Sequence, residues 1–309
     1  MRIPEGLQAR RRLGPDWAAW VDVLPRRCDD LLAEWRLTPV GEPLHGFASV
    51  VVPVRGADGA AAMLKVGFDG AEETAQEHLA LRIWDGDGAV RLYRADPARR
   101  ALLLERLGAE GRSAVDLSTE WDLRACELVA GFYPRLHRPA PKRFPALPRL
   151  LDGWLTALET DAHAVPMPRR MVDQALALGR DLVVDPNAVG TIVHGDLHYG
   201  NVLAAEREPW LVIDPQPVSG DPHYEVAPLL WNRWDEMAGY LRESIRRRFA
   251  AVVETAGFDD ERARDWVIVR MVLNAHWAVE DARRAGRRLD ADEHDWITRC
   301  ISVVKAVQD

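Results

Sequence analysis

The spacing of apolar residues changes twice within the first third of the chain. In residues 15–35 apolar side chains recur at helical intervals, which predicts one or two leading helices. Residues 47–54 and 60–66 are apolar and β-branched runs, and the sequence Ala57-Asp58-Gly59 between them is typical of a turn. These runs predict a hairpin, and the helical spacing of residues 72–84 predicts a helix after it.

Two more short strands are expected after this helix, in residues 90–93 and 101–104, on either side of the turn Asp96-Pro97. The order over residues 45–105 is therefore strand, strand, helix, strand, strand. This order predicts a small antiparallel sheet with one helix packed on it.

Helical spacing dominates the chain from Leu107 onward, except in one segment with strand character. The expected helices cover one long stretch at residues 116–137 and shorter ones at 150–158, at 169–184 and after 222. Strand patterns return between residues 189 and 214, at 189–193, 202–205 and 210–213. A larger helical region with one β insertion is therefore expected to follow the small sheet.

Composition narrows the class of protein. Lys and Arg total 40, Asp and Glu total 48, and the formal charge is −8. This balance disfavours a nucleic-acid binder, because phosphate contacts need a basic face. Three widely spaced cysteines predict neither a disulfide framework nor a cysteine-type zinc site. No apolar run approaches about 18 residues, and no apolar region follows the basic N-terminus, so we expect a cytoplasmic protein without a membrane span.

The segment HGDLHYGN, residues 194–201, and the hairpin after it carry the strongest chemical pattern. Asp196 and Asn201 lie on one loop, and the hairpin ends at Asp214, which a two-stranded return would bring back beside that loop. Carboxylate and amide oxygens suit Mg²⁺ and not a soft metal, and one aspartate remains to accept a proton from a hydroxyl. Phosphoryl transfer needs this combination of a base and Mg²⁺.

These motifs resemble the aminoglycoside phosphotransferases, which are small-molecule relatives of the protein kinases. HGDLHYGN matches the family pattern HGDxxxxN, and IDPQPVSGDP matches its metal loop. The run from NVLAAEREPW to PLLWN, together with WDGDGAVRLY and LLLERL, is most similar to the streptomycin 6-phosphotransferase and hydroxyurea phosphotransferase branch. The resemblance implies an α+β, bilobal protein-kinase-like fold, with a nucleotide-binding lobe at 1–106 and a catalytic, acceptor-binding lobe at 107–309.

The resemblance also assigns roles in catalysis. It makes Asp196 the catalytic base and implies that Asn201 and Asp214 hold Mg²⁺. Gly195 stands where many protein kinases have the arginine that reads a phosphorylated activation loop. We therefore expect an enzyme that is active without phosphorylation.

The family holds the ATP phosphates with a strand lysine that pairs with a helix carboxylate. Only three of the 40 basic residues are lysines, and Lys65 is the one in a predicted strand ahead of a helix. Its partner is expected to be Glu77, or Glu73 if the helix is rotated differently. No GxGxxG motif is present, and the weak glycine loop contains only Gly46. The other residues that the resemblance assigns to the nucleotide are Ser49, Glu105 and Leu107.

The acceptor is expected to be a small organic cation such as streptomycin, because aromatic and acidic side chains follow the catalytic segment. The residues assigned to it are His198, Trp231, Asp235, Trp277, Glu280 and Asp281. Hydroxyurea or another metabolite is the alternative acceptor. A metallophosphoesterase and a catalytically inactive kinase-like binding module are the competing classes. We expect no nucleic-acid or membrane partner, and a monomer or small homo-oligomer.

Overall fold

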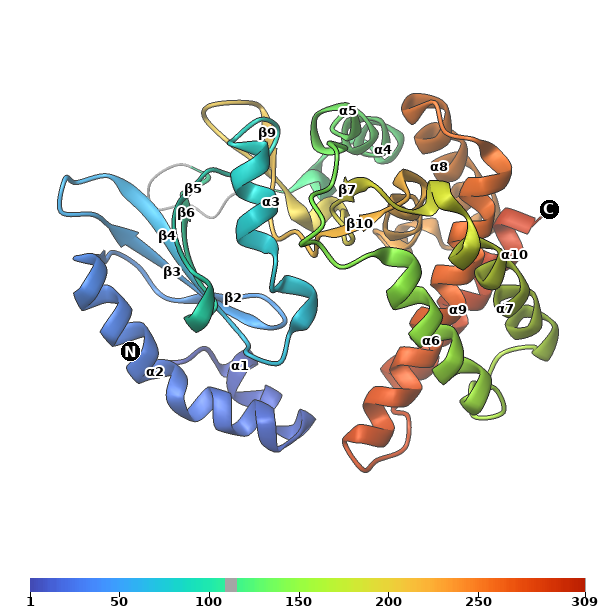
Figure 1. Ribbon diagram of the computed structural model, residues 1–309, viewed down its shortest axis with the longest axis horizontal. Helices are drawn as coiled ribbons and strands as arrows, with labels where there is room; N and C mark the ends of the chain where they lie inside the picture. Colours follow the sequence, from blue (N-terminus) through green and yellow to red (C-terminus); the bar gives the residue numbers. More distant parts are fainter. Residues whose placement is uncertain (109–115, 309) are drawn as a thin grey trace. The chain divides into compact units, whose positions relative to one another are not determined.

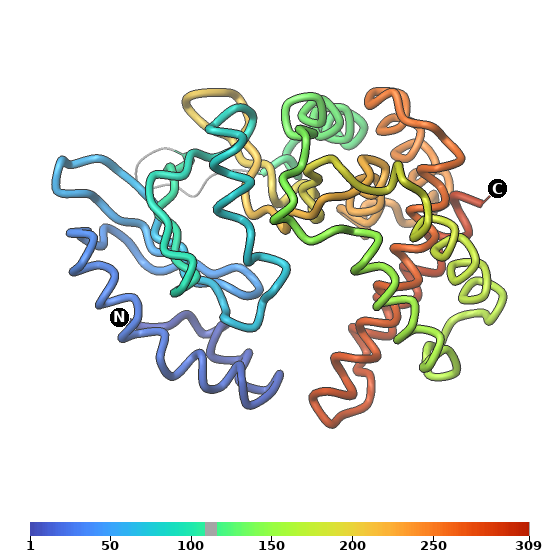
Figure 2. The backbone as a smooth tube through the Cα atoms, viewed as in Figure 1, coloured from blue at the N-terminus to red at the C-terminus, as the bar shows by residue number. Residues whose placement is uncertain are grey.

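The chain divides into two compact units. The computed structural model describes residues 1–108 and 116–308. Unit 1 comprises Met1–Val115 and Leu203–Gln216, and unit 2 comprises Asp116–Val202 and Pro217–Asp309. The segment 203–216, which can be followed in Figure 2, belongs to unit 1. From the sequence, everything after residue 106 was instead expected to belong to the second lobe. That boundary stays a prediction. None of the helices in the described residues is long and apolar enough to cross a membrane.

Unit 1 is built on an antiparallel sheet with the strand order β1-β3-β4-β6-β5, and β2 pairs with β3 (Figure 1). The strands are β1 (Thr38–Pro39), β2 (Leu44–His45), β3 (Ser49–Arg55), β4 (Ala61–Gly67), β5 (Leu92–Asp96) and β6 (Ala101–Glu105). The predicted order of strand, strand, helix, strand, strand is confirmed. The two shortest strands, β1 and β2, were not predicted, because two residues show no alternation.

One face of this sheet is covered by α2 (Pro15–Trp35), which is a single helix despite Pro25. Its buried residues share one core with Val52 of β3 and with Leu64 and Val66 of β4. Because side chains alternate along a strand, Lys65 points to the opposite face of the sheet. That face therefore carries the predicted nucleotide-binding lysine.

The helix on this opposite face is shorter than its sequence pattern predicts. Residues 72–84 were expected to form one helix, but Glu72–Thr74 form a 3-10 turn and α3 begins only at Glu77 and ends at Trp84. Leu81 and Trp84 of α3 are fully buried. The late start places Glu77 in the first turn of α3.

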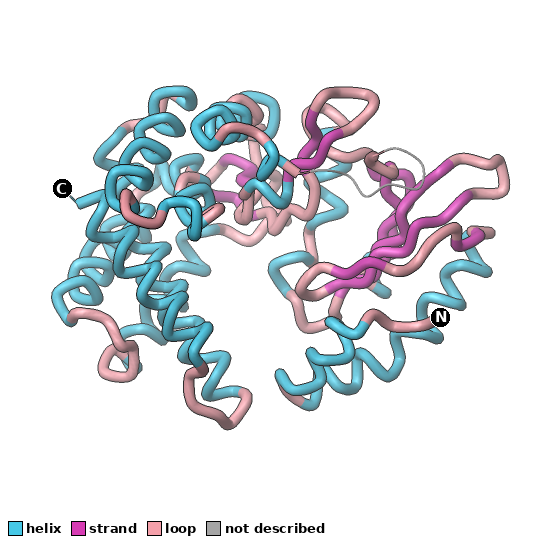
Figure 3. Tube along the Cα trace, turned by 180° about the vertical axis from the view of Figure 1, so that it is seen from behind, coloured by secondary structure: helices cyan, strands magenta, loops and turns pink. Residues whose placement is uncertain are grey.

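Unit 2 is mostly helical, as predicted (Figure 3). Its helices are α4 (Asp122–Ala130), α5 (Tyr133–Leu136), α6 (Leu147–Asp161), α7 (Arg169–Val184), α8 (Leu241–Ala256), α9 (Asp260–Arg284) and α10 (Ala291–Gln308). Helix α9 packs against α6, α7 and α10 and is buried along most of its length. It therefore forms the core of this unit.

The predicted long helix at residues 116–137 is wrong. The segment contains a 3-10 turn, Leu117–Thr119, followed by α4 and α5. The Asp116 carboxylate accepts from the Ser118 amide and caps the first turn. Trp121 is extended, and Pro134 lies in the first turn of α5, where the lack of an N–H costs no helical hydrogen bond. The apolar periodicity continues across these breaks and concealed them.

Four short strands lie before and after the loop 194–201 along the chain. Strand β7 (Thr191–Val193) pairs antiparallel with β10 (Val218–Gly220), and β8 (Val202–Ala204) pairs with β9 (Trp210–Val212). The strands β7, β8 and β9 were predicted, whereas β10 was not. The loop 194–201 follows β7 directly, so its start is fixed by a buried strand.

Candidate active site

Lys65 is the centre of a buried charge cluster in unit 1. Its Nζ lies 2.7 Å from both carboxylate oxygens of Glu77 and also contacts the carboxylate of Asp214. Lys65 and Glu77 are only 6% and 4% exposed. Burial lowers the pKa of Lys65, but Asp214 and Glu77 outweigh it and raise this pKa above its ordinary 10.5. The structure thus places Glu77, rather than Glu73, at the lysine.

Asp214 follows β9 with an unusual backbone. Its φ of 56° is left-handed, which is unfavourable for a residue with a side chain and is enriched at functional sites. The Asp214 side chain is partly exposed while one oxygen contacts Lys65. Burial raises the pKa of Glu77, an effect that Lys65 opposes and Asp214 reinforces. One ammonium group is therefore shared by two carboxylates.

Ser49 and Gly46 form a tight turn close to Asp214. The Gly46 amide donates to the Ser49 carbonyl at 3.0 Å, and Ser49 begins β3 with a buried side chain. A Cβ on Gly46 would lie 3.2 Å from Ser49 Oγ and 4.0 Å from Asp214 Oδ2. Within unit 1 the turn 46–49 therefore lies beside Asp214, although the sequence has no glycine-rich motif there.

The predicted nucleotide residues Glu105 and Leu107 lie at and just after the end of β6. The Glu105 carboxylate is held by Arg207 Nη2 at 3.0 Å and by the Arg91 amide at 3.0 Å. Arg207, in the turn between β8 and β9, also donates to the carbonyls of Gly86 and Ala89. The Glu105 side chain therefore holds the turn between β8 and β9 in place. Only the backbone of Glu105 is left for the predicted contact with adenine.

The loop 194–201 in unit 2 is held by hydrogen bonds to its own backbone. Asn201 Nδ2 donates to the Asp196 carbonyl at 2.8 Å, so its Oδ1 is the atom left to face a cation. The Asp196 amide lies 3.3 Å from Nδ1 of the fully buried His194, and the His194 amide donates to Glu225. Gly195 has φ of 83°, a conformation that explains why glycine stands here. The loop presents Asp196 on a constrained backbone.

His198 is both a cap and a neighbour of Asp196. Its Nδ1 accepts from the Gly200 amide at 3.1 Å, so in the neutral ring the proton is on Nε2. That Nε2 lies 3.8 Å from Asp196 Oδ2. His198 therefore caps the loop and orients a ring N–H toward the Asp196 carboxylate, to which the family resemblance assigns the role of base.

Arg270, on α9, was not predicted as a site residue. The residue is only 8% exposed, and its guanidinium carbon lies 4.5 Å from the centroid of the Tyr224 ring and 5.2 Å from that of the Trp277 ring. The guanidinium also donates to the Gly195 carbonyl. Burial lowers the pKa of Arg270 to about 10, and the Asp196 carboxylate opposes this. A buried cation thus stands behind the loop that carries Asp196. In a chain so rich in arginine, nothing in the sequence distinguished this one.

A cavity in unit 2 brings together part of the predicted acceptor set. Trp277 and Asp281 line it, together with side chains that the sequence did not single out: Asn274, Ala278, Glu293 and Trp296. Burial raises the pKa of Asp281, whereas hydrogen bonds from Arg287 lower that of Glu293. Aromatic faces beside carboxylates are the surroundings that an organic cation prefers.

The other predicted acceptor residues lie outside the lining of this cavity. Trp231 packs edge-on against Trp296 at 5.3 Å and so supports one of its walls. Asp235 is exposed in a 3-10 turn, and Glu280 lies 3.8 Å from Nδ1 of the buried His276. The structure therefore groups Trp231 with the cavity and separates Asp235 and Glu280 from its walls.

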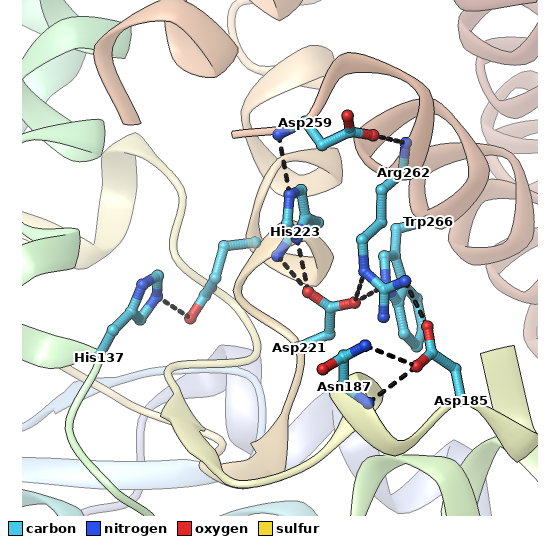
Figure 4. Close-up of polar contacts among 9 residues, drawn as sticks. His137, Asp185, Asn187, Asp221, His223, Asp259, Arg262 and Trp266 are labelled. Atoms are coloured by element: carbon cyan, nitrogen blue, oxygen red, sulfur yellow. Dashed lines mark hydrogen bonds and ion pairs between the residues drawn. The ribbon is translucent and has the colours of Figure 1, made fainter. Parts of the chain in front are cut away.

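Asp221, which follows β10, is held by a network of protein donors. Its buried carboxylate accepts from the His223 ring, from Arg262 at 2.6 Å and from Trp266 at 2.5 Å (Figure 4). Arg262 also pairs with Asp185. With every oxygen engaged by protein donors, Asp221 fastens the β10 loop to α9 rather than serving a ligand.

Comparisons with known proteins agree with this geometry. The model of the aminoglycoside/hydroxyurea antibiotic resistance kinase family matches residues 34–282. A streptomycin 6-kinase of Streptomyces glaucescens is 39% identical over 292 residues, covering 92% of this chain and 93% of that protein. A hydroxyurea phosphotransferase of Kitasatospora aureofaciens is 40% identical over 270 residues, covering 86% of this chain and 76% of that protein.

Solved structures confirm the predicted protein-kinase-like fold. A choline kinase from Streptococcus pneumoniae has a TM-score of 0.60 at 12% identity, covering 91% of this chain and 96% of that one. An aminoglycoside phosphotransferase has a TM-score of 0.59 at 16% identity, covering 91% and 99%. At these identities the likeness concerns the fold alone.

Proposed function

The chain belongs to the aminoglycoside/hydroxyurea antibiotic resistance kinase family and is therefore a kinase of small-molecule hydroxyls. We propose that its acceptor is streptomycin and that its phosphoryl donor is ATP with Mg²⁺. Membership excludes the metallophosphoesterase and the binding module as readings of the motif. We also propose that the enzyme works in the cytoplasm. Its proposed state is a monomer or a small homo-oligomer.

The observation that carries the acceptor is the cavity lined by Trp277, Trp296 and Asp281; Glu293 of the same lining is already paired with Arg287. Streptomycin bears guanidinium groups, which are planar cations that stack on indole rings and pair with carboxylates. Hydroxyurea is small and uncharged, so these walls favour it less, although the hydroxyurea phosphotransferase relative keeps it as the second candidate.

The donor site is proposed in unit 1. Lys65 is a compact cation held ready by Glu77, which suits contact with nucleotide phosphates. Ser49 and the backbone of the turn 46–49 take the place of a glycine-rich loop. The backbone near Glu105 and Leu107 meets adenine, as in the family.

Oxygen donors are available for Mg²⁺. The partly exposed Asp214 carboxylate and Asn201 Oδ1 are hard ligands of the kind that Mg²⁺ accepts, and phosphates and water complete such a shell. When bound, the ion neutralises charge on the phosphates.

Asp196 is proposed as the general base that takes the proton from the acceptor hydroxyl. The hydrogen bond from the Asn201 side chain to the Asp196 carbonyl fixes the loop, and the buried Arg270 guanidinium holds the neighbouring Gly195 carbonyl. Since the nucleophile is a neutral hydroxyl, the base must be both ionised and oriented before transfer begins.

A coupled assay of ADP release tests the proposal. Wild-type enzyme is given ATP and Mg²⁺ with streptomycin, with hydroxyurea, or with an aminoglycoside that lacks guanidinium groups. We expect release that depends on streptomycin, and its loss in Asp196→Asn, a variant of nearly identical shape that still binds ATP. If the enzyme turns over hydroxyurea but not streptomycin, hydroxyurea becomes the proposed acceptor. If Asp196→Asn keeps full turnover, Asp196 is not the base.

A further inference from the structure

The N-terminal segment of unit 1 touches both neighbours of Gly46. This segment comprises α1 (Glu5–Gln8) and a 3-10 turn, Ala9–Leu13. The Arg10 guanidinium carbon lies 4.0 Å from the centroid of the Phe47 ring. On the other side, the His45 ring approaches Gly6 so closely that a Cβ on Gly6 would lie 2.3 Å from His45 Nε2. The N-terminal segment thus contacts the turn 46–49 at two points, His45 just before it and Phe47 within it.

Arg10 makes this contact without an acidic partner. Among residues 1–108 and 116–308, no carboxylate pairs with Arg10, and its buried Nε has no hydrogen-bond partner. Burial and the neighbouring Arg12 both lower the pKa of Arg10. The neighbouring Arg11, in contrast, pairs with Asp22. A partly desolvated cation held over an aromatic ring is a specific arrangement rather than a solvated surface charge.

Phe47 is itself supported from below. Its ring meets Trp17 of α2 edge-on at 5.7 Å, and Trp17 stacks on Phe68 at 4.1 Å. The Phe68 amide donates to the Ala48 carbonyl at 2.8 Å. Phe47 is 60% exposed even with the Arg10 guanidinium over its ring. The stack Arg10–Phe47–Trp17–Phe68 therefore fastens the tip of the turn to the first long helix.

We propose that the N-terminal segment holds the turn 46–49 in the conformation that binds the ATP phosphates, and that Arg10 is a positioning residue acting through Phe47. The inference rests on the proposed role of this turn in nucleotide binding. The contacting residues Gly6 and Arg10 lie outside residues 34–282, the part that the family model matches. The part matched by the family model therefore does not by itself account for the support of this turn.

The test measures ATP affinity by calorimetry and the KM values for ATP and for the acceptor in the full chain. Arg10→Ala should weaken ATP binding about two- to fivefold, the range of one cation–π contact, with the acceptor KM unchanged. Arg10→Lys should retain most of the affinity. Arg12→Ala is the matched control, because it removes the same charge from an exposed neighbour and should leave ATP binding unchanged.

A double-mutant cycle separates positioning from a direct phosphate contact. In a Phe47→Leu background, Arg10→Ala should have no further effect on ATP affinity. An equal effect in both backgrounds, or an Arg10→Ala variant that binds ATP like the wild type, would overturn the inference. If the wild type binds no ATP, the proposed function is wrong. If Lys65→Ala loses ATP binding while Arg10→Ala retains it, only the positioning role of Arg10 is wrong.

Discussion

Lys65 and Glu77 form a bidentate ion pair on the sheet face opposite to the α2 core, with Nζ 2.7 Å from each carboxylate oxygen. Both side chains are buried, so neither charge has water as a substitute partner. Removing one member of such a pair leaves an uncompensated buried charge, whereas replacing both by apolar residues does not. The pair therefore links nucleotide binding to the stability of unit 1.

Glu77→Leu is predicted to lower the free energy of unfolding by about 1.5–3 kcal/mol, because the buried Lys65 loses one charged partner and keeps only the partly exposed Asp214. The double variant Lys65→Met, Glu77→Leu should recover most of this loss and still lack turnover. Urea unfolding followed by circular dichroism measures the first effect, and ADP release the second. A double variant as unstable as Glu77→Leu would contradict the reasoning.

Lys65→Arg is the sharper change at the same position. Arginine keeps the charge but presents a wider planar group, which cannot reproduce a point charge held between Glu77 and phosphate. We expect weaker ATP affinity and slower turnover with little loss of folded protein. Unchanged ATP affinity and rate would mean that the lysine is there by chance.

Arg270→Met is predicted to reduce kcat about 10- to 100-fold, the equivalent of one buried hydrogen bond to a charged group, with KM for ATP unchanged. The guanidinium contacts the Gly195 carbonyl and the rings of Tyr224 and Trp277, so its loss releases the backbone next to Asp196. Arg270→Lys should restore part of the rate by returning the charge. Steady-state kinetics on variants with wild-type melting temperatures checks this, and a normal kcat in Arg270→Met would contradict it.

The sequence singled out those candidate residues whose type is rare or whose spacing is fixed. Lys65 stood out because lysine is rare in this chain, and Asp196 and Asn201 because they lie five residues apart in one motif. Asp214 was placed by the hairpin that ends at it. Local patterns were sufficient here, because each signal lies within about 20 residues of chain.

The features that were missed depend on contacts between distant segments. The choice between Glu73 and Glu77 depended on where α3 begins, and the 3-10 turn before it follows from packing. Arg270 and Arg207 resemble every other arginine until the fold buries one beside Gly195 and ties the other to Glu105. Strand β10 has three residues, too few for alternation, and forms because β7 offers it a partner.

Asp221→Asn is predicted to destabilise unit 2 by about 2–3 kcal/mol at neutral pH, because Arg262 and Trp266 lose a charged acceptor. Burial works against the charged form, yet hydrogen bonds from His223 and Trp266 hold the pKa of Asp221 below its usual 3.8. The folded state therefore binds fewer protons than the unfolded state, and the charge stabilises the fold above pH 3.8 and ceases to do so as the pH falls through the lower folded value. Urea unfolding from about pH 7 to about pH 3 should show the gap between wild type and variant closing. A gap independent of pH would contradict the assignment.

The last prediction concerns the cavity beside α9. Asp281→Asn and Trp277→Leu should each raise KM for streptomycin about 5- to 30-fold, the equivalent of about 1–2 kcal/mol from a desolvated cation–aromatic or charged contact, and leave KM for ATP unchanged. The charge-matched control is Asp295→Asn, an exposed residue of α10 that does not line the cavity and should leave both KM values unchanged. Hydroxyurea separates specificity from general damage, because an uncharged acceptor gains nothing from a carboxylate or an indole face. If turnover with hydroxyurea falls as much as turnover with streptomycin, the cavity supports the fold of α9 and does not select a cation. If only the streptomycin KM rises, the two walls recognise the guanidinium groups of the acceptor.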